Sequence, residues 1–254
     1  TLRDIKKINN ILDTVISVKN VYKNFGEIEA ISGITFSVKK SSTLGLLGSN
    51  GAGKTTMIMM LMGILKSSSG EINILNQDIY KYRNHISKEI NFASPFVELP
   101  HKLTVLQNLI VFGHIYGVIN LSKKIEKLSI DLGIKDLLKR RVGKLSAGQK
   151  TRVSIAKALI NEPKILFLDE PTASLDPDHA DWIRTYLEEF QKKNGSTFIL
   201  ASHNMSEVER MCDNVIMMGK GKVIDSGSPE DLINRYQKND LEEVFLQLAR
   251  NKRV

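Results

Sequence analysis

Apolar residues along this 254-residue chain follow different spacings in different regions, and near the start they alternate with polar residues. Residues 15–18 and 34–38 both show this alternation, and turn residues around Asn24 and Gly26 lie between them. Alternation at period two predicts short antiparallel strands with one buried face. The sequence therefore predicts a small antiparallel β layer in the N-terminal region.

Continuous apolar runs predict a second kind of strand, buried on both faces. One run spans residues 43–47, and two more, residues 164–168 and 197–201, are separated by a helical segment. Unbroken runs of this kind are typical of parallel strands covered by helices. Residues 57–62 predict an apolar helix and residues 71–75 a further strand. Together these segments predict an α/β core.

Helical spacing of apolar residues dominates between residues 96 and 150. We interpret this region as an α-helical subdomain inserted between strands of the core. Further along, residues 215–218 and 222–225 flank a Gly-Lys-Gly turn and predict a hairpin. Ser228, followed by a proline and two acids, predicts the N-cap of a helix.

The predicted organisation has three parts along the chain. Residues 1–13 show no capped periodic pattern and are expected to form a loosely attached extension. Residues 14–226 form the main domain, and residues 227–254 form a helical tail. An apolar stripe from Leu241 to Leu248 is expected to pack that tail against the domain.

The composition is that of an ordinary globular protein, with 42% hydrophobic and 25% charged residues. The net charge of +8 is spread along the chain, so we expect no nucleic-acid partner and take the charge as a weak indication of a membrane surface. Cys212 is the only cysteine, which excludes a disulfide framework and fits a cytosolic compartment. The apolar runs are far shorter than the ~20 residues that a bilayer span requires, and we expect no leader segment.

A complete phosphate-binding motif, G-x-x-x-x-G-K-[ST], follows the first continuous apolar run. Its residues are Gly48, Ser49, Asn50, Gly51, Ala52, Gly53, Lys54 and Thr55, with Thr56 behind them. The glycines let backbone N–H groups turn toward phosphate oxygens, where a Cβ would obstruct them. Lys54 supplies a positive charge for the β and γ phosphates, and Thr55 offers a hydroxyl to Mg²⁺. The helix that follows directs the positive end of its dipole toward the triphosphate.

Two acids and a histidine follow the later apolar runs. Asp169 can hold Mg²⁺ opposite Thr55, while Glu170 can orient and deprotonate an attacking water. His203 follows the other run and could donate a hydrogen bond to the γ-phosphate. All three are expected at the carboxyl edge of the sheet, where open α/β sheets bind ligands. The alternatives are a pair of solvated loop acids and a structural histidine.

Residues 145–149, Leu-Ser-Ala-Gly-Gln, precede a basic helix and could form a second anion site at its start. Taken alone, Ser146 would only be an N-cap. The combination of the phosphate loop, residues 145–149, 166–170 and 174–176, and His203, in this order, resembles the nucleotide-binding domain of ATP-binding cassette (ABC) ATPases. The resemblance covers roughly residues 14–226.

The resemblance implies a fold class and an activity. The fold is α/β: a P-loop NTPase core of the ABC ATPase type, with an N-terminal antiparallel β subdomain and an inserted α-helical subdomain. The activity is hydrolysis of ATP with Mg²⁺ as cofactor. In this family two domains close head to tail around two ATP molecules, so the partner of this chain would be a second ABC ATPase subunit, here expected to be a second copy.

The resemblance also implies roles across that dimer. Ser146, Gly148 and Gln149 would contact the ATP held by the phosphate loop of the partner, and Asp176 would carry contacts between the two sites. Phe25 occupies the place of the aromatic residue that stacks on adenine, and the alternative for it is a core phenylalanine.

One position departs from the family pattern. A glutamine that touches Mg²⁺ usually begins the helical subdomain, whereas this chain has Pro95 there, which offers neither a side-chain oxygen nor a backbone donor. Either the hydroxyl of Ser94 replaces the amide after a shift of the loop, or a water does. The departure bears on coupling to a membrane partner more than on hydrolysis.

The C-terminal part of the chain resembles the ATPase subunits of bacterial ABC exporters, which pair with a separate membrane permease. This implies a peripheral location on the cytoplasmic face of the membrane, with the surface around residues 96–116 as the docking site for the permease. An importer subunit is the nearest alternative. A non-transport ABC protein would be expected to carry a second cassette or a long coiled coil, and the sequence has neither.

Overall fold

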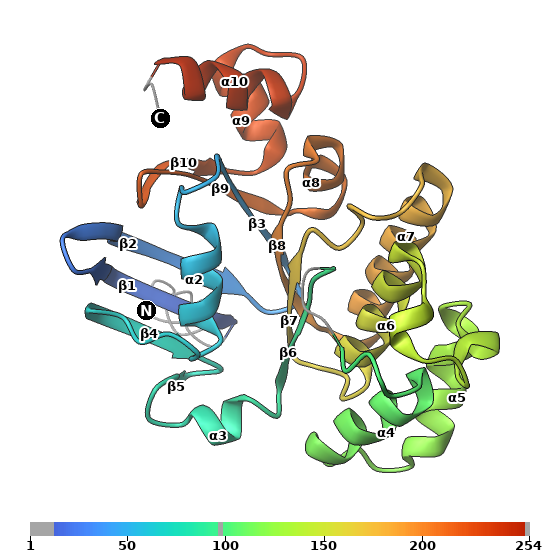
Figure 1. The fold of residues 1–254 in the computed structure, drawn as a ribbon. Helices are drawn as coiled ribbons and strands as arrows, with labels where there is room; N and C mark the ends of the chain where they lie inside the picture. Colours follow the sequence, from blue (N-terminus) through green and yellow to red (C-terminus); the bar gives the residue numbers. More distant parts are fainter. Residues whose placement is uncertain (1–12, 96–98, 252–254) are drawn as a thin grey trace, which may run out of the picture. The chain divides into compact units, whose positions relative to one another are not determined.

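The structure is a computed structural model that describes residues 13–95 and 99–251, and Figure 1 shows its elements in chain order. The chain divides into two compact units. The first combines residues up to 87 with residues from 197 onward, and the second comprises residues 88–196. The predicted N-terminal extension lies outside the described residues, except for Asp13.

The predicted antiparallel β layer is confirmed in the first unit (Figure 1). Strands β1 (Thr14–Phe25), β2 (Ile28–Lys39), β4 (Ser69–Ile74) and β5 (Gln77–Asp78) form one sheet in the order β2-β1-β4-β5. β1 and β2 are 12 residues each, longer than the short strands predicted. The register of their pairing shifts between positions 18 and 21, which interrupts the alternation and makes each strand look shorter in the sequence.

The same unit contains the strands that carry the phosphate motif. β3 (Thr43–Gly48) pairs in parallel with β8 (Thr197–Ala201) and with β9 (Asn214–Gly219). β9 turns back into β10 (Lys222–Gly227) as the predicted hairpin. The two turn residues between β9 and β10 both have positive φ, 47° and 74°, as a tight two-residue hairpin requires. The pairing of β9 with β3 was not predicted.

Helices of the first unit are α2, α3, α8, α9 and α10. They span Lys54–Leu61, Arg83–Ile86, Met205–Met211, Pro229–Tyr236 and Leu241–Asn251. The hydroxyl of Ser228 accepts a hydrogen bond from the backbone N–H of Asp231, which confirms the predicted N-cap of α9. Leu241, Val244 and Leu248 of α10 are buried, so the apolar stripe packs on the domain as predicted.

The second unit contains two parallel strands, β6 (Ile90–Ala93) and β7 (Ile165–Asp169). Its helices are α4 (Val105–Ile115), α5 (Leu121–Asp131), α6 (Ala147–Leu159) and α7 (Pro177–Asn194), with 3₁₀ turns at Lys135–Leu137 and Val142–Lys144. The region predicted as helical, residues 96–150, contains α4, α5, both 3₁₀ turns and the start of α6, which continues beyond residue 150. Within the described part of the chain, the helices are too short or too polar to cross a membrane.

Candidate functional site

The phosphate motif connects β3 to α2 in a tight loop in which glycine is required at two positions. A Cβ at Gly48 would lie 2.5 Å from the carbonyl oxygen of Met218, and one at Gly53 would lie 2.7 Å from Cδ1 of Ile31. Gly53 also has a φ of +102°, which side chains rarely adopt. At Gly51, with φ +81°, a Cβ would meet nothing within 4 Å. Packing within the protein therefore requires glycine at positions 48 and 53, whether or not a ligand also needs close approach to the backbone there.

The N-terminus of α2 has features that suit the binding of an anion. Its N-cap is Gly53, it has no side-chain cap hydrogen bond among the described residues, and its first turn contains no acid. The ammonium of Lys54 donates to the carbonyl oxygens of Gly48 (2.6 Å) and Ser49 (3.1 Å), which holds it against the loop. Orphan N–H groups and a fixed positive charge are what a phosphate group needs.

The remaining residues of the motif differ in exposure. Ala52 is buried, and its backbone N–H donates to the carbonyl of Ser49 while its own carbonyl accepts from Gly221. Asn50 and Thr55 are exposed and Thr56 is half-buried. The exposed Thr55 hydroxyl is a hard oxygen donor of the kind that Mg²⁺ prefers.

The β9–β10 turn supports the loop, a contribution that was missed from the sequence. Gly221 donates to the carbonyl of Ala52, and its own carbonyl accepts from the N–H of Ser32. A Cβ at Gly221 would lie 2.6 Å from the carbonyl oxygen of Ala30. The sequence marked Gly221 only as a turn residue, because nothing local indicates which strand it would meet.

His203 lies in the same unit as the phosphate loop and follows β8. Because β3 and β8 are parallel neighbours, their carboxyl ends reach the same sheet edge. Hydrogen bonds of both neighbouring residues hold His203 in place. The buried hydroxyl of Ser202 donates to Glu207 (2.6 Å), and the side chain of Asn204 caps α8. His203 itself is exposed at this edge.

Asp169 and Glu170 belong to the second unit. Asp169 ends β7, and Glu170 follows with a φ of +53°, a strained conformation for a side chain other than glycine. Both are half-buried, which is not the exposure of a pair of solvated loop acids. Since Ala93 pairs with Leu168, the residues after β6 and β7 emerge at one edge, so Ser94 and Pro95 follow the same edge as the two acids.

Ser94 is only 2% exposed, and its carbonyl oxygen accepts from the hydroxyl of Ser154 in α6 (3.4 Å). A cavity of about 210 Å³ lies beside Ser94, Pro95, Lys150 and Ser154. Ser94 itself lines this cavity, which is large enough for water. Both alternatives for the missing glutamine, the Ser94 hydroxyl and a water, therefore lie at the same cavity.

Ser146 is an N-cap, as its residue type alone suggests. Its hydroxyl accepts from the N–H of Gln149 (3.3 Å) and the Gln149 side chain accepts from the N–H of Ser146 (3.1 Å), forming a capping box at the start of α6. The N–H groups of Ala147 and Gly148 have no partner within the helix. The capping box therefore leaves those two donors for an anion. Of the basic residues that follow, Arg152 instead donates to the carbonyl of Gly133.

Asp176 is the N-cap of α7 and pairs with His179. Its carboxylate accepts from the backbone N–H of His179 (3.1 Å) and lies 2.8 Å from the ring Nδ1. The backbone hydrogen bond, followed by the side-chain one, lowers the pKa of Asp176 from its usual value. The carboxylate is exposed and stays ionised near neutral pH.

Phe25 ends β1 at the tip of its hairpin and is 48% exposed, so the alternative of a core phenylalanine is wrong. The ammonium of Lys23 lies 4.9 Å from its ring centroid. An exposed ring with a cation beside it can receive a flat base.

Comparison with known proteins identifies relatives across most of the chain. The family model described as "ABC transporter" matches residues 31–173. Nod factor export ATP-binding protein I of Rhizobium sp. (strain N33) is 36% identical over 91% of this chain and 76% of its own length. ABC transporter ATP-binding protein NatA of Bacillus subtilis (strain 168) is 35% identical over 86% of this chain and 90% of its own. The solved structure of cbiO1 from Clostridium perfringens, described as part of the ABC transporter complex cbiONQ, is 34% identical and covers 89% of this chain and 92% of that chain, with a TM-score of 0.78.

Proposed function

Because the chain belongs to the ABC transporter ATP-binding family, we propose that this ATPase drives export of a substrate through a separate membrane permease. The observation that carries the hydrolytic part of the proposal is the N-terminus of α2. It has no side-chain cap and no acid, and the Lys54 ammonium is held against the loop that precedes it. These features fit a triphosphate.

We assign the following roles to the chain's own residues. The N–H groups of the loop and of α2 bind the phosphates, and Lys54 binds the β and γ phosphates as a point charge. Glu170 accepts a proton from the attacking water, and His203 donates a hydrogen bond to the γ-phosphate. Phe25 stacks on the adenine. The positive φ of Glu170 supports its role, because strain of this kind gathers at functional sites.

Thr55 and Asp169 are the residues that we assign to Mg²⁺. A hydroxyl and a carboxylate are suitable donors, since Mg²⁺ is commonly held by one or two carboxylates together with substrate phosphates. The ion would neutralise charge on the phosphates when bound.

We further propose that a second copy of the chain completes the site. The N–H groups at the start of α6, together with Ser146, Gly148 and Gln149, would face the γ-phosphate bound by the partner, and Asp176 would contact the partner's site. Two features support this assignment: the capping box leaves the N–H groups of Ala147 and Gly148 without a helical partner, and Asp176 is exposed.

Export is favoured over import by the names of the relatives, since Nod factor export proteins recur among them. A multidrug ABC transporter ATP-binding protein of Escherichia coli (strain K12) is also similar. The location that follows from this proposal is the cytoplasmic face of the membrane, beside the permease.

The surface of α4 is the proposed docking site for that permease. Val111 and Ile115 lie one helical turn apart and are 46% and 65% exposed, and Ile110 beside them is 37% exposed. Part of the predicted docking segment, residues 96–98, lies outside the described residues. Adjacent exposed apolar side chains of this kind mark interaction surfaces more often than isolated ones do.

Two variants test the catalytic assignment. Glu170→Gln keeps the shape of the side chain but cannot take a proton, so we expect retained ATP binding and a loss of hydrolysis of at least about 100-fold. Lys54→Ala removes the phosphate contact, so we expect ATP binding itself to weaken. ATP binding is measured by equilibrium titration and hydrolysis by phosphate release. An unchanged rate in Glu170→Gln would contradict the role of Glu170 and favour a nucleotide sensor without turnover.

A further inference from the structure

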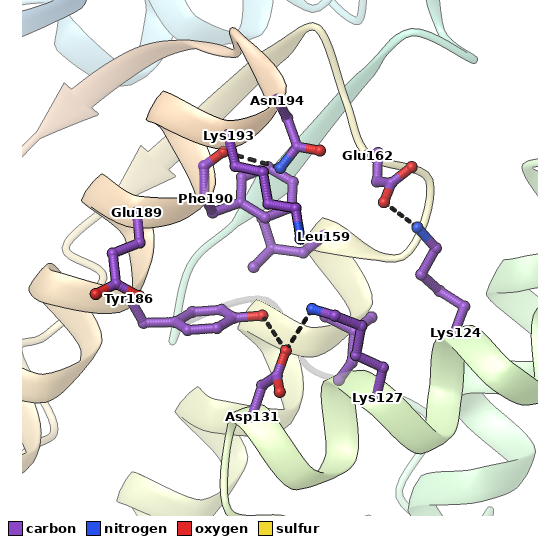
Figure 2. A pocket seen from close by; sticks show the side chains of 11 residues that line it. Lys124, Lys127, Asp131, Leu159, Glu162, Tyr186, Glu189, Phe190, Lys193 and Asn194 are labelled. Carbon is purple, nitrogen blue, oxygen red and sulfur yellow. Dashed lines mark hydrogen bonds and ion pairs between the residues drawn. The ribbon is translucent and has the colours of Figure 1, made fainter.

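A cavity of about 330 Å³ lies within the second unit, between α5, the end of α6 and α7 (Figure 2). None of the residues that line it belongs to the candidate nucleotide site. Its volume is at the lower end of the range of small-molecule sites, about 300–1,000 Å³. We call it the α5–α7 cavity.

One side of the α5–α7 cavity is apolar. Leu128 of α5, Leu159 of α6 and Phe190 of α7 line it, and each is at most 9% exposed. The ring of Tyr186, one turn before Phe190 on α7, extends into the cavity below Leu159 and Phe190 in this view (Figure 2). Aliphatic and aromatic walls of this kind suit a flat apolar body.

The carboxylates that line the cavity are mostly neutralised. Asp131 accepts from the ammonium of Lys127 (2.7 Å) and from the hydroxyl of Tyr186 (3.2 Å), and Glu162 pairs with Lys124. Burial and the charge of Asp131 raise the pKa of Tyr186, so its hydroxyl remains a neutral donor to that carboxylate. A cationic ligand would therefore have to displace an existing ion pair.

Lys193 is different from the other two lysines of the cavity. Among the described residues it has no ion-pair partner, and its side chain runs from α7 toward the apolar wall (Figure 2). Glu189, the remaining acid, lies at the outer edge beyond the Tyr186 ring in this view. Three lysines and three acids line the cavity, and Lys193 places a positive charge beside the apolar wall, on the side away from Glu189 in this view (Figure 2).

We propose that the α5–α7 cavity binds a small organic anion that combines one carboxylate with a flat apolar body. Lys193 holds the carboxylate. Leu128, Leu159 and Phe190 bury the apolar body. This site is independent of the nucleotide site and does not require the proposed direction of transport.

Isothermal titration of the full chain with 1-naphthoate tests the proposal, with 1-naphthylmethanol as the neutral probe of the same ring. We expect naphthoate to bind and the alcohol to bind at least about fivefold more weakly, because a charge-assisted hydrogen bond is lost. Lys193→Met should weaken naphthoate binding by about tenfold. Lys192→Met is the matched control, since Lys192 is an exposed neighbour on α7 that does not line the cavity, and it should leave the affinity within about twofold.

Lys54→Ala separates this site from the phosphate loop, and naphthoate should bind that variant as well as it binds the parent chain. Thermal unfolding confirms that each variant is folded. The proposal is overturned if about 5 mM naphthoate gives no binding, a concentration at which even weak sites fill. It is also overturned if the acid and the alcohol bind equally, if both α7 variants lose affinity equally, or if Lys54→Ala abolishes binding.

Discussion

Lys157, in the last turn of α6, shows the cost of burying a single charged side chain in this fold. It is 9% exposed, and its ammonium donates to the side-chain oxygen of Asn91 (3.2 Å) and the carbonyl of Phe92 (2.9 Å), with the ring of Phe112 5.3 Å away. No carboxylate is among these partners in the described part of the chain. Burial therefore lowers the pKa of Lys157 from 10.5 to about 8.

This shift predicts a pH dependence of stability. Between pH 8 and 10.5 the unfolded chain still holds the Lys157 proton that the folded chain has released, so the stability of the native protein should rise with pH in this window. The Lys157→Met variant has no ammonium at this position, so its stability should lack this rise with pH. Relative to that variant, the free energy of unfolding of the parent chain should increase by about 3 kcal/mol from pH 7.5 to 10.5.

Urea unfolding at several pH values measures this difference, and Lys192→Met serves as the control because its side chain is exposed. The control should track the parent chain across the window. A constant difference between the parent and Lys157→Met would show that the buried ammonium keeps an ordinary pKa.

At the residue scale, the sequence predicts the chemistry of the phosphate loop but not its support. The spacing of Gly48, Gly53 and Lys54 was sufficient to predict that chemistry, because the residues of the motif are close together in the sequence. The contacts of Met218, Ile31 and Gly221 with the loop come from strands far away in the chain, and no local pattern indicates them. For the same reason the burial of Ser94 could not be foreseen.

At the element scale, two capping boxes start two helices of the second unit. Ser146 with Gln149 starts α6, and Thr104 with Gln107 starts α4. The two are equivalent in structure, since each hydroxyl accepts from the N–H three residues on. Only the capping box of Ser146 belongs to the proposed anion site. Comparing it with the capping box of Thr104 therefore separates the structural role of a cap from a role in function.

Ser146→Asp should keep the cap but lose activity. Aspartate caps helices as well as serine does, and its charge is favourable at a helix N-terminus, so stability should stay within about 0.5 kcal/mol. If Ser146 faces a γ-phosphate, the new charge should lower the ATPase rate by at least about tenfold. Thr104→Asp is the control, with unchanged stability and rate. Equal rates in both variants would remove Ser146 from the site.

Element boundaries were predicted best where the pattern was uninterrupted. β3, β7 and β8 are buried throughout or nearly so, and their apolar runs predicted them to within one residue. β6 was missed because it has only four residues and includes the polar Asn91. Secondary structure in such a segment is decided by its pairing with β7, which is a tertiary contact.

At the scale of the whole molecule, we propose that the chain is one part of an assembly with a permease. Ile115→Glu on α4 should abolish co-purification with that permease, because a charge replaces an exposed apolar contact. It should leave the ATPase rate of the isolated chain within about twofold, since surface changes are usually mild. Ile130→Glu on α5, where the residue is 55% exposed, is the matched control. Retained co-purification in Ile115→Glu would place docking elsewhere.

In the proposed cycle, two copies of the chain close around ATP and hydrolyse it. The ATPase rate per protomer as a function of protein concentration tests this cycle, for the parent chain and for Glu170→Gln, with molecular mass determined in ATP and Mg²⁺. We expect a rate that climbs with concentration and is lost in Glu170→Gln, while an ATP-bound dimer accumulates in that variant. A rate per protomer that is independent of concentration, with a monomer throughout, would contradict it.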